Sequence, residues 1–458
     1  MLVGREGKLD SLEKSWAASG FRFAVLYGVH RCGKTKLLSE FVREKNGIFF
    51  SAQKLNCFMN LRVFEKTVSA YSGEEEKFER WKDAFARIGK LAKEKRLLLV
   101  IDNFSDLISD EHSIFSDFKN AMENEWRSAD LFVVASSSKV FFTETEILSE
   151  NTAFSIHRPQ VVKLEELDYL DAAKLLPEGT STENKVRYYG CLGGIPEYLK
   201  LVDGKLSFEE NIRNIFLTPN APLFEAPPMV FLDELREPSF YNSILYALSK
   251  GSRRINEIVN ETGESSTKVN KYLMTLLQMQ IVGRDVPFGE ENKTSRKGIY
   301  TVNTKSLAFW FRFVLPHQAD IVCGKEVLPN LSEEIDKYLA DRVFEQICAQ
   351  YMSRKNKQGD LPILASSMAG YWSSLKESTE TRLVATNQRN RQILFAECHW
   401  NFEKPWEEMQ LYIRQNDKLF PEYWERFDML FSFRPFPTEY RRAEGAKLRL
   451  VDAKDLYR

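Results

Sequence analysis

Short apolar runs and a helical pattern alternate in the first part of the chain. Residues 21–27 (FRFAVLY) and 96–102 (RLLLVID) are mostly apolar, which is typical of strands buried on both faces of a parallel sheet. Residues 36–42, which follow the first run after a short loop, carry apolar side chains at helical spacing. Strands that alternate with helices predict an α/β fold with a parallel sheet.

The loop between the first strand and its helix has a phosphate-binding sequence. Residues 28–35, GVHRCGKT, fit the pattern G-x-x-x-x-G-K-[ST] in the strand, loop and helix context that the pattern needs. Two glycines let the backbone N–H groups and the helix N-terminus face phosphates. We therefore expect ATP or GTP to bind through Gly28, Val29, His30, Arg31, Cys32, Gly33, Lys34, Thr35 and Lys36.

Three of these positions and one aspartate have individual roles. Lys34 is expected to reach the β- and γ-phosphates, and Thr35 to give a hydroxyl ligand to Mg²⁺. The second apolar run ends in Asp102, the pattern of a buried strand whose aspartate organises Mg²⁺ at its carboxyl end. His30 and Cys32 need to supply only backbone, so we assign neither a catalytic role.

The middle of the chain has the order of elements of a winged helix-turn-helix. Helical stretches at 241–248, 255–262 and 266–280 are followed by two strand-like runs at 281–284 and 298–302. The third helix and the wing would present Thr267, Lys268, Asn270, Lys271, Lys293, Arg296 and Lys297 to DNA. Nearby glutamates dilute this basic face, so a protein contact is as compatible with the pattern as a DNA contact.

Length and charge indicate a multi-domain protein of the cytoplasm. The chain has 458 residues, too many for one core, and its 64 Lys and Arg balance 65 Asp and Glu. The six cysteines show no C-x-x-C pair, and the histidines are scattered without metal spacing. No apolar run approaches the length of a membrane span and no leader precedes Gly4, so we expect a soluble, cytoplasmic protein with reduced thiols.

Three further motifs resemble one protein family. The chain opens with LVGRE, followed by an amphipathic stretch around Leu9, Leu12 and Trp16. It also contains LFVVASSS at 131–138 and GGIPEYL at 193–199. In order and spacing these motifs resemble the prokaryotic archaeal-type ATPase family, in the signal-transduction (STAND) branch of AAA+ proteins. The resemblance implies adenine contacts from Val3, Gly4 and Arg5, a γ-phosphate-sensing strand with a polar tip, and a helical lid.

The residue after Asp102 departs from the pattern of that family. Its members usually carry a glutamate that orients and deprotonates the attacking water, whereas this chain has Asn103. An amide cannot accept the proton, and general-base assistance is typically worth about 10²–10⁴ in rate. We therefore expect tight ATP binding and slow hydrolysis. Asp106 is an alternative base, although a solvated loop carboxylate is the favoured interpretation of it.

Arg158 is the candidate for stabilising charge on the transferred phosphoryl group. It follows the sensing strand where members of the family often have an arginine, and it could act in its own chain or in a neighbouring one. An exposed loop arginine is the favoured interpretation of it. The predicted catalytic residues are therefore Asp102, Asn103 and Arg158.

The last part of the chain begins with LAFWFRF at 307–313, similar to the segment that joins the winged helix to the C-terminal domain in the same family. An aromatic helix face in the core is compatible with this resemblance. Strand-like runs follow at 380–385 and 393–400, where relatives commonly read EIDIVA and ECKW. Those residues form a restriction-nuclease-like site, with two acidic ligands for Mg²⁺ and a lysine.

This chain keeps only part of that nuclease-like site. Arg382 stands at the aspartate position and His399 at the lysine position, so only Glu397 remains of the three. A guanidinium beside the carboxylates repels Mg²⁺, and we expect an ion pair of Glu397 or Glu380 with Arg382 instead. The sequence predicts a nuclease-like fold without nuclease activity.

These inferences combine into one architecture and two functional alternatives. We expect a P-loop ATPase core at 1–163, a helical lid and linker at 164–230, a winged helix-turn-helix at 231–303 and a small α/β nuclease-like domain at 304–458. The favoured function is an ATP- and Mg²⁺-dependent switch with slow hydrolysis, which contacts DNA through Lys268, Lys271, Arg296 and Lys297, or binds a protein partner. The alternative is a faster, oligomeric ATPase that works on a protein or nucleic acid.

Overall fold

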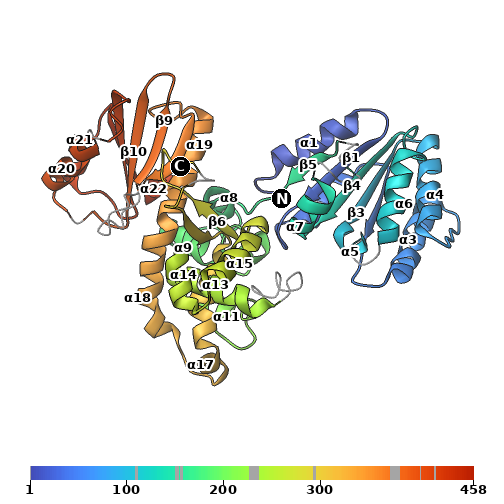
Figure 1. Ribbon diagram of the computed structural model, residues 1–458, viewed down its shortest axis with the longest axis horizontal. Coiled ribbons are helices and arrows are strands. Elements are labelled where there is room, and N and C mark those ends of the chain that lie inside the picture. The colour runs from blue at the N-terminus through green and yellow to red at the C-terminus, as the bar shows by residue number, and fades with distance from the viewer. Residues whose placement is uncertain are drawn as a thin grey trace. The chain divides into compact units, whose positions relative to one another are not determined.

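The computed structural model describes residues 2–108, 112–149, 154, 158–225, 237–291, 295–371, 382–402, 404–416 and 419–458. The chain divides into two compact units (Figure 1). The first consists of Met1–Leu167 and Ile195–Glu197, and the second of Asp168–Gly194 and Tyr198–Arg458. The finer division into four domains stays a prediction.

The first unit is built on a parallel five-stranded sheet. Its strands lie in the order β2 (Gly47–Ser51), β3 (Leu97–Asp102), β4 (Leu131–Ser137), β1 (Arg22–Tyr27) and β5 (Gln160–Lys163). Every neighbouring pair is parallel. The helices are α1 (Glu6–Ala17), α2 (Lys34–Val42), α3 (Cys57–Ser72), α4 (Trp81–Glu94), α5 (Phe104–Ile108), α6 (His112–Glu123) and α7 (Val140–Phe142), with a π-helical turn η1 (Thr143–Ile147). The predicted α/β fold with a parallel sheet is confirmed.

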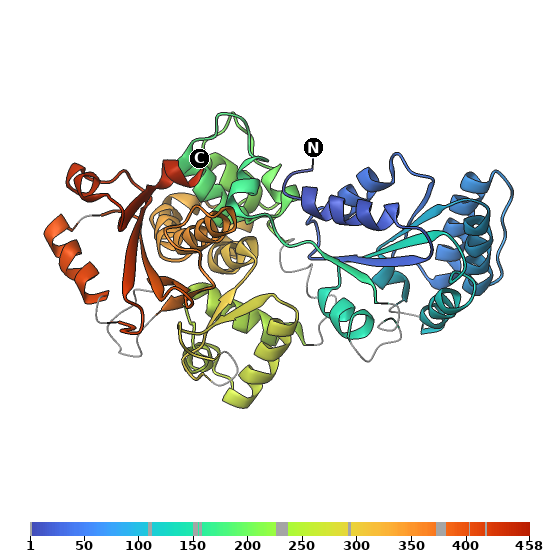
Figure 2. The ribbon, with the colours of Figure 1, turned by 90° about the horizontal axis from the view of Figure 1, so that it is seen from above.

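Helices cover both faces of this sheet, as Figure 2 shows. Successive side chains of a strand point to opposite faces, and β1 follows this rule. Phe23 and Val25 pack in one core with residues of α3, α4 and α6, whereas Ala24 and Leu26 pack in another with residues of α1 and α2. Burial on both faces explains why β1 and β3 are nearly continuous apolar runs.

The second unit starts with helices. They are α8 (Tyr169–Ala173), α9 (Thr182–Leu192), α11 (Phe208–Phe216), α13 (Pro238–Lys250), α14 (Ile255–Thr262) and α15 (Ser266–Gln278), and α10 (Pro196–Leu199) lies at the border of the two units. The hydroxyl of Ser265 accepts the Lys268 N–H at 3.3 Å, the expected cap of α15. An antiparallel pair of strands, β6 (Val282–Asp285) and β7 (Ile299–Val302), follows in the predicted order.

A second helical layer follows the β6–β7 pair. It contains α16 (Lys305–Phe309), η3 (Trp310–Val314), η4 (Leu315–His317), α17 (Gln318–Val322), α18 (Leu328–Tyr338), η5 (Leu339–Val343) and α19 (Phe344–Gln358). The aromatic segment at 307–313 lies in the core, as predicted: Phe309 and Phe313 are fully buried, and Trp310 donates its ring N–H to the Phe224 carbonyl at 2.7 Å.

A separate mixed sheet occupies the C-terminal part, as predicted. Its order is β12 (Leu448–Asp452), β11 (Glu425–Ser432), β10 (Gln392–His399), β9 (Arg382–Asn387) and β8 (Ser367–Tyr371). The pairs from β10 to β12 are parallel, and β8, β9 and β10 pair antiparallel. The remaining helices are α20 (Trp406–Asn416), α21 (Thr438–Ala443) and α22 (Ala453–Leu456).

The loop between β6 and β7 reaches the outer strand of this sheet. The Phe288 N–H donates to the Gly370 carbonyl of β8 at 2.7 Å. The ring of Phe288 lies edge-on to Phe420, with centroids 5.1 Å apart. The β6–β7 loop is therefore bound to the C-terminal sheet.

No helix in the described part of the chain has the length and apolarity needed to cross a membrane.

Candidate nucleotide-binding site

The phosphate-binding loop lies where the sequence predicts it, between β1 and α2. The Gly28 N–H donates to the Ser137 carbonyl at 3.2 Å, which joins the start of the loop to the end of β4. A Cβ atom at Gly28 would lie 2.1 Å from the Leu164 carbonyl oxygen, so only glycine fits there without a shift of backbone. Gly33 has a φ of 97°, a conformation that side chains disfavour. Both glycines of the motif are therefore required by geometry.

Lys34 is held inside the loop. Its side chain is buried, and Nζ donates to the carbonyls of Gly28 and Val29 at 2.9 Å each. Burial lowers the pKa of the Lys34 ammonium, although the nearby Asp102 opposes this shift. The cation thus lies among the loop carbonyls, next to the backbone that would surround a phosphate.

Thr35 and Asp102 meet at the carboxyl end of the sheet. Thr35 Oγ1 donates to Asp102 Oδ2 at 2.8 Å. The other carboxylate oxygen, Oδ1, accepts the hydroxyl of Ser136, which lies on the neighbouring strand β4. Asp102 and Ser136 are both almost fully buried. Two residues predicted to bind Mg²⁺ are therefore brought into direct contact, and Ser136 fixes the orientation of the carboxylate.

Asn103 follows Asp102 in a left-handed conformation, with a φ of 56°, which asparagine tolerates better than most residues. Its backbone N–H donates to Ser136 Oγ at 3.2 Å. Its side-chain amide donates to the Ala52 carbonyl at 3.3 Å, just beyond the end of β2. The amide group is therefore bonded to the neighbouring strand of the sheet.

Asp106 is not the solvated loop carboxylate that we expected. It belongs to α5, and its Oδ1 lies 3.0 Å from the Lys139 ammonium. Its side chain is only 26% exposed. The carboxylate already has a cationic partner, which makes it a poor substitute for a general base.

The N-terminal motif packs against the loop. Val3 and Arg5 are buried, and Gly4 has a φ of 63°. The Arg5 guanidinium donates to the Cys32 carbonyl of the loop at 3.2 Å and to the Glu165 carbonyl at 2.6 Å. Contacts of these residues with adenine stay a prediction. Arg5 also binds the backbone carbonyls of Cys32 and Glu165, two partners that the sequence did not reveal.

Another contact joins the loop to the GGIPEYL motif. Arg31 Nε lies 3.7 Å from Glu197 Oε2, and both residues belong to the first unit. The pair is partly exposed, so it contributes little to stability. It nevertheless connects two motifs that are far apart in the sequence.

Arg158 is exposed, in agreement with the favoured interpretation of a loop arginine, and the strand register places it away from this site within one chain. It precedes β5, whose first residue, Gln160, is in register with Ala24 of β1. The loop follows Tyr27, which pairs with Lys163 at the other end of β5. Gln160 is therefore about 10 Å from the edge that carries the loop, and Arg158 lies at the opposite edge, where it is exposed. Its use by a neighbouring chain stays a prediction.

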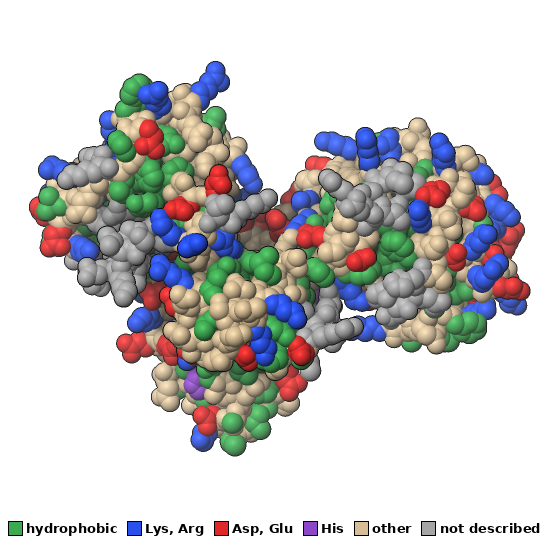
Figure 3. All heavy atoms as spheres, viewed as in Figure 1, with side chains coloured by type: hydrophobic (Ala, Val, Ile, Leu, Met, Phe, Trp, Pro, Cys, Tyr) green, Lys and Arg blue, Asp and Glu red, His purple; other side chains and the backbone are tan. Residues whose placement is uncertain are grey.

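The residues predicted to face DNA are partly neutralised. Lys268 Nζ lies 3.2 Å from Glu264, and Lys297 Nζ lies 2.6 Å from Glu290. Lys271 and Arg296 are exposed, and Lys293 lies outside the described residues. Lys, Arg, Asp and Glu side chains are mixed over the visible face of the molecule (Figure 3).

The residues of the nuclease-like motif are only partly described. Glu397 is buried near the end of β10, and His399 is the last residue of that strand. Glu380 and the side chain of Arg382 lie outside the described residues, as does the ion pair expected between them. Within the described residues, no group of three or more His, Cys, Asp or Glu side chains is arranged to hold a metal ion.

Comparisons with known proteins agree with the motifs. Residues 2–202 match a family described as an ATPase domain predominantly from Archaea. Residues 310–409 match a family of archaeal and bacterial proteins of unknown function. An uncharacterized protein of Methanocaldococcus jannaschii is 26% identical over 400 residues, which cover 87% of this chain and 88% of the relative.

Two solved structures are also similar to this chain. A Walker-type ATPase of Pyrococcus abyssi gives a TM-score of 0.51 at 16% identity, and the match covers 68% of this chain and 96% of that protein. The ORC2 protein of Aeropyrum pernix, solved in ADPNP–ADP complexes, gives a TM-score of 0.47 at 13% identity over 70% of this chain and 95% of that protein. At this level of identity, the likeness to the Pyrococcus protein shows a shared fold.

Proposed function

Since residues 2–202 form an ATPase domain of the archaeal family, we propose that this protein binds ATP with Mg²⁺ and uses the bound nucleotide as a switch, with slow hydrolysis as its timer. The observation that carries the proposal is the hydrogen bond of 2.8 Å between Thr35 and Asp102, beside the buried Lys34. These three side chains come from different parts of the sequence, and the sheet brings them to one edge.

The donor set at this edge suits Mg²⁺. A hydroxyl and a carboxylate are the hard oxygen ligands that Mg²⁺ takes in proteins, with phosphate oxygens and water as the other ligands. Thr35 and Asp102 would hold the ion, which when bound neutralises charge on the β- and γ-phosphates. Lys34 would supply a second positive charge, and the backbone between the two motif glycines would orient the phosphates.

Slow hydrolysis follows from the chemistry and the bonding of Asn103. The amide has no basic atom to accept a proton from water, and its NH₂ group already donates to the Ala52 carbonyl. The other nearby carboxylate, Asp106, is paired with Lys139. Neither Asn103 nor Asp106 thus offers an unpaired base, which favours a long-lived ATP state over rapid turnover.

A switch also needs contacts through which the loop can act on other segments. Arg5 joins the loop carbonyl of Cys32 to Glu165, and Arg31 joins the loop to Glu197. Glu165 and Glu197 flank the two places where the chain leaves the first unit. A bound phosphate that competes with Glu197 for Arg31, or that shifts the loop, would therefore change the contacts beside the two points where the chain leaves the first unit.

DNA contact has weaker support than nucleotide binding. Helices α13, α14 and α15 and the β6–β7 pair have the order of a winged helix-turn-helix. However, two of the basic residues that would face DNA already have glutamate partners. We propose a DNA contact of low affinity that depends mainly on Lys271 and Arg296.

Turnover and binding measured on the same samples test the proposal. We expect the wild-type protein to bind Mg²⁺-ATP and to hydrolyse it far more slowly than about one per second, and Lys34→Ala to lose binding. Asn103→Glu restores a base and should raise turnover, whereas the control Asn103→Gln changes length in the same way without adding a base. Wild-type turnover of about one per second or faster would refute the slow switch and favour the oligomeric ATPase.

A further inference from the structure

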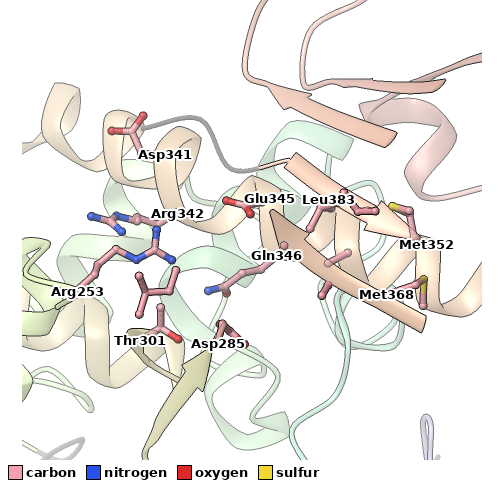
Figure 4. Close-up of a pocket in the computed structure, with 15 residues that line it drawn as sticks. Arg253, Asp285, Thr301, Asp341, Arg342, Glu345, Gln346, Met352, Met368 and Leu383 are labelled. Carbon is pink, nitrogen blue, oxygen red and sulfur yellow. The ribbon is translucent and has the colours of Figure 1, made fainter. Parts of the chain in front are cut away.

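A cavity of about 370 Å³ lies within the second unit, whereas the phosphate-binding loop belongs to the first (Figure 4). Its wall is formed by four parts of the chain: Arg253, two residues before α14; the strands β6 and β7; the helical run through η5 and α19; and the strands β8 and β9. This volume falls within the range of small-molecule sites, roughly 300–1,000 Å³. The cavity is therefore large enough for a metabolite.

Two arginines, Arg253 and Arg342, line one side of the cavity. Arg253 and Arg342 form no ion pair among the described residues, and the buried Nε of Arg253 has no hydrogen-bond partner among them. Burial lowers the pKa of both guanidinium groups, and the charge of Arg253 further lowers the pKa of Arg342. Two neighbouring, partly desolvated cations make a favourable place for an anionic group, which guanidinium groups bind bidentately.

The same side of the cavity also contains carboxylates. Asp285, at the end of β6, forms no ion pair among the described residues, and burial raises the pKa of its carboxyl group. The charge of Glu345 opposes the lowering of the pKa of Arg253, so the Glu345 carboxylate lies within electrostatic range of the Arg253 guanidinium. The cavity thus has both cationic and anionic side chains, and a charged ligand could pair with one kind or with both.

The other side of the cavity is apolar. Met352 of α19, Met368 of β8 and Leu383 of β9 line it. In Figure 4 these three side chains lie apart from the two arginines, with Glu345 and Gln346 between the two groups. Methionines adapt to different apolar shapes, as they do at sites that accept several ligands.

We propose that this cavity binds a small carboxylic acid with an apolar body, with the carboxylate between Arg253 and Arg342 and the body against Met352, Met368 and Leu383. The acid has two chemical sources: a simple fatty acid, or an apolar α-amino acid whose ammonium group faces Asp285. Because the cavity joins the segment before α14 to the C-terminal sheet, the acid would be a second input to the switch, independent of the nucleotide.

Isothermal titration of the full chain without nucleotide tests this proposal, with three eight-carbon probes: octanoate, 2-aminooctanoate and 1-octanol. We expect the two acids to bind and 1-octanol to bind at least about tenfold more weakly, because it lacks the charge that the arginines recognise. Arg253→Gln should weaken the acids by about ten- to a hundredfold. Arg254→Gln is the matched control, because it removes the same charge from the neighbouring, exposed residue, which does not line the cavity.

A further variant separates the two sources of the acid. Because Asp285 also lies within electrostatic range of Arg253, Asp285→Asn should weaken 2-aminooctanoate relative to octanoate if the ligand is an amino acid, and should weaken neither probe if it is a fatty acid. Circular dichroism of each variant shows whether it is folded, and Arg253→Lys, which keeps the charge but not the fork, should give an intermediate affinity. No saturable binding of either acid to the wild type up to about 1 mM, or equal binding by Arg253→Gln and Arg254→Gln, would overturn the proposal. Neither outcome depends on ATP binding, so either one would leave the proposed nucleotide switch unaffected.

Discussion

Ser136 is the residue whose removal tests the construction of the nucleotide site most directly. Its hydroxyl donates to Asp102 Oδ1 and accepts the Asn103 N–H at 3.2 Å. Both Ser136 and Asp102 are at most 1% exposed, so water cannot replace the lost partner without a rearrangement. Ser136→Ala keeps the Cβ atom and removes both hydrogen bonds.

The size of the effect follows from what the substitution leaves behind. A buried polar group without its partner costs about 1–3 kcal/mol, and a charged group costs more. One carboxylate oxygen and one N–H together give about 2–6 kcal/mol, a large part of the roughly 5–15 kcal/mol by which a domain is stable. Asp102 also loses the contact that orients it toward Thr35, so the Mg²⁺ concentration needed for half-maximal ATP binding should rise about tenfold or more.

Urea unfolding and a titration of ATP binding against Mg²⁺ measure the two effects. Ser137→Ala is the matched control, because Ser137 is the next residue on β4 and is equally buried. Its hydroxyl accepts from Thr143 Oγ1 at 2.7 Å and from the Lys139 N–H at 3.1 Å, and within the described residues it forms no hydrogen bond to Asp102. We expect Ser137→Ala to lower stability but not the response to Mg²⁺. A response to Mg²⁺ that changes equally in both variants, or in neither, would refute the role given to Ser136.

Two further predictions concern the phosphate-binding loop and the proposed DNA contact. Gly28→Ala places a Cβ atom 2.1 Å from the Leu164 carbonyl oxygen and should abolish ATP binding and lower the melting temperature. The control Gly7→Ala, whose Cβ atom meets nothing within 4 Å, should change neither. A thermal-shift assay with ATP measures both effects, and equal behaviour of the two variants would contradict the prediction. If only Lys271 and Arg296 contact phosphates, the logarithm of the affinity for duplex DNA should fall with the logarithm of salt with a slope of about −2, and Lys271→Glu should make the slope shallower by about one unit. A steep slope that is unchanged in Lys271→Glu would show that DNA binds elsewhere.

The central strands and the phosphate loop were predictable because their signals are local. A buried parallel strand must be apolar on both faces, so β1 and β3 are visible as continuous runs. The loop motif fixes its own backbone through glycines, and its lysine and threonine follow within two residues. The capping serine of α15 is a local signal of the same kind.

Contacts between distant segments were not predictable from the sequence. The partners of Arg5 lie 27 and 160 residues away, and nothing local to Arg5 indicates them. The distance of Arg158 from the loop was not predictable for a related reason: it depends on the register of β5 against β1, which one sequence does not fix at an edge strand with only four residues. Asp106 was misjudged because a short helix, α5, replaces the expected loop and brings it to Lys139.

The contact between Phe288 and β8 has a consequence for how copies of this protein behave at high concentration. β8 is the outermost strand of the C-terminal sheet, and an unpaired strand edge is a template for pairing with another chain. The Phe288 N–H occupies the Gly370 carbonyl on this edge, and the ring of Phe420 holds Phe288 in place. The β6–β7 loop therefore covers part of this edge, and we expect that shortening the loop would expose the edge of β8 and promote aggregation.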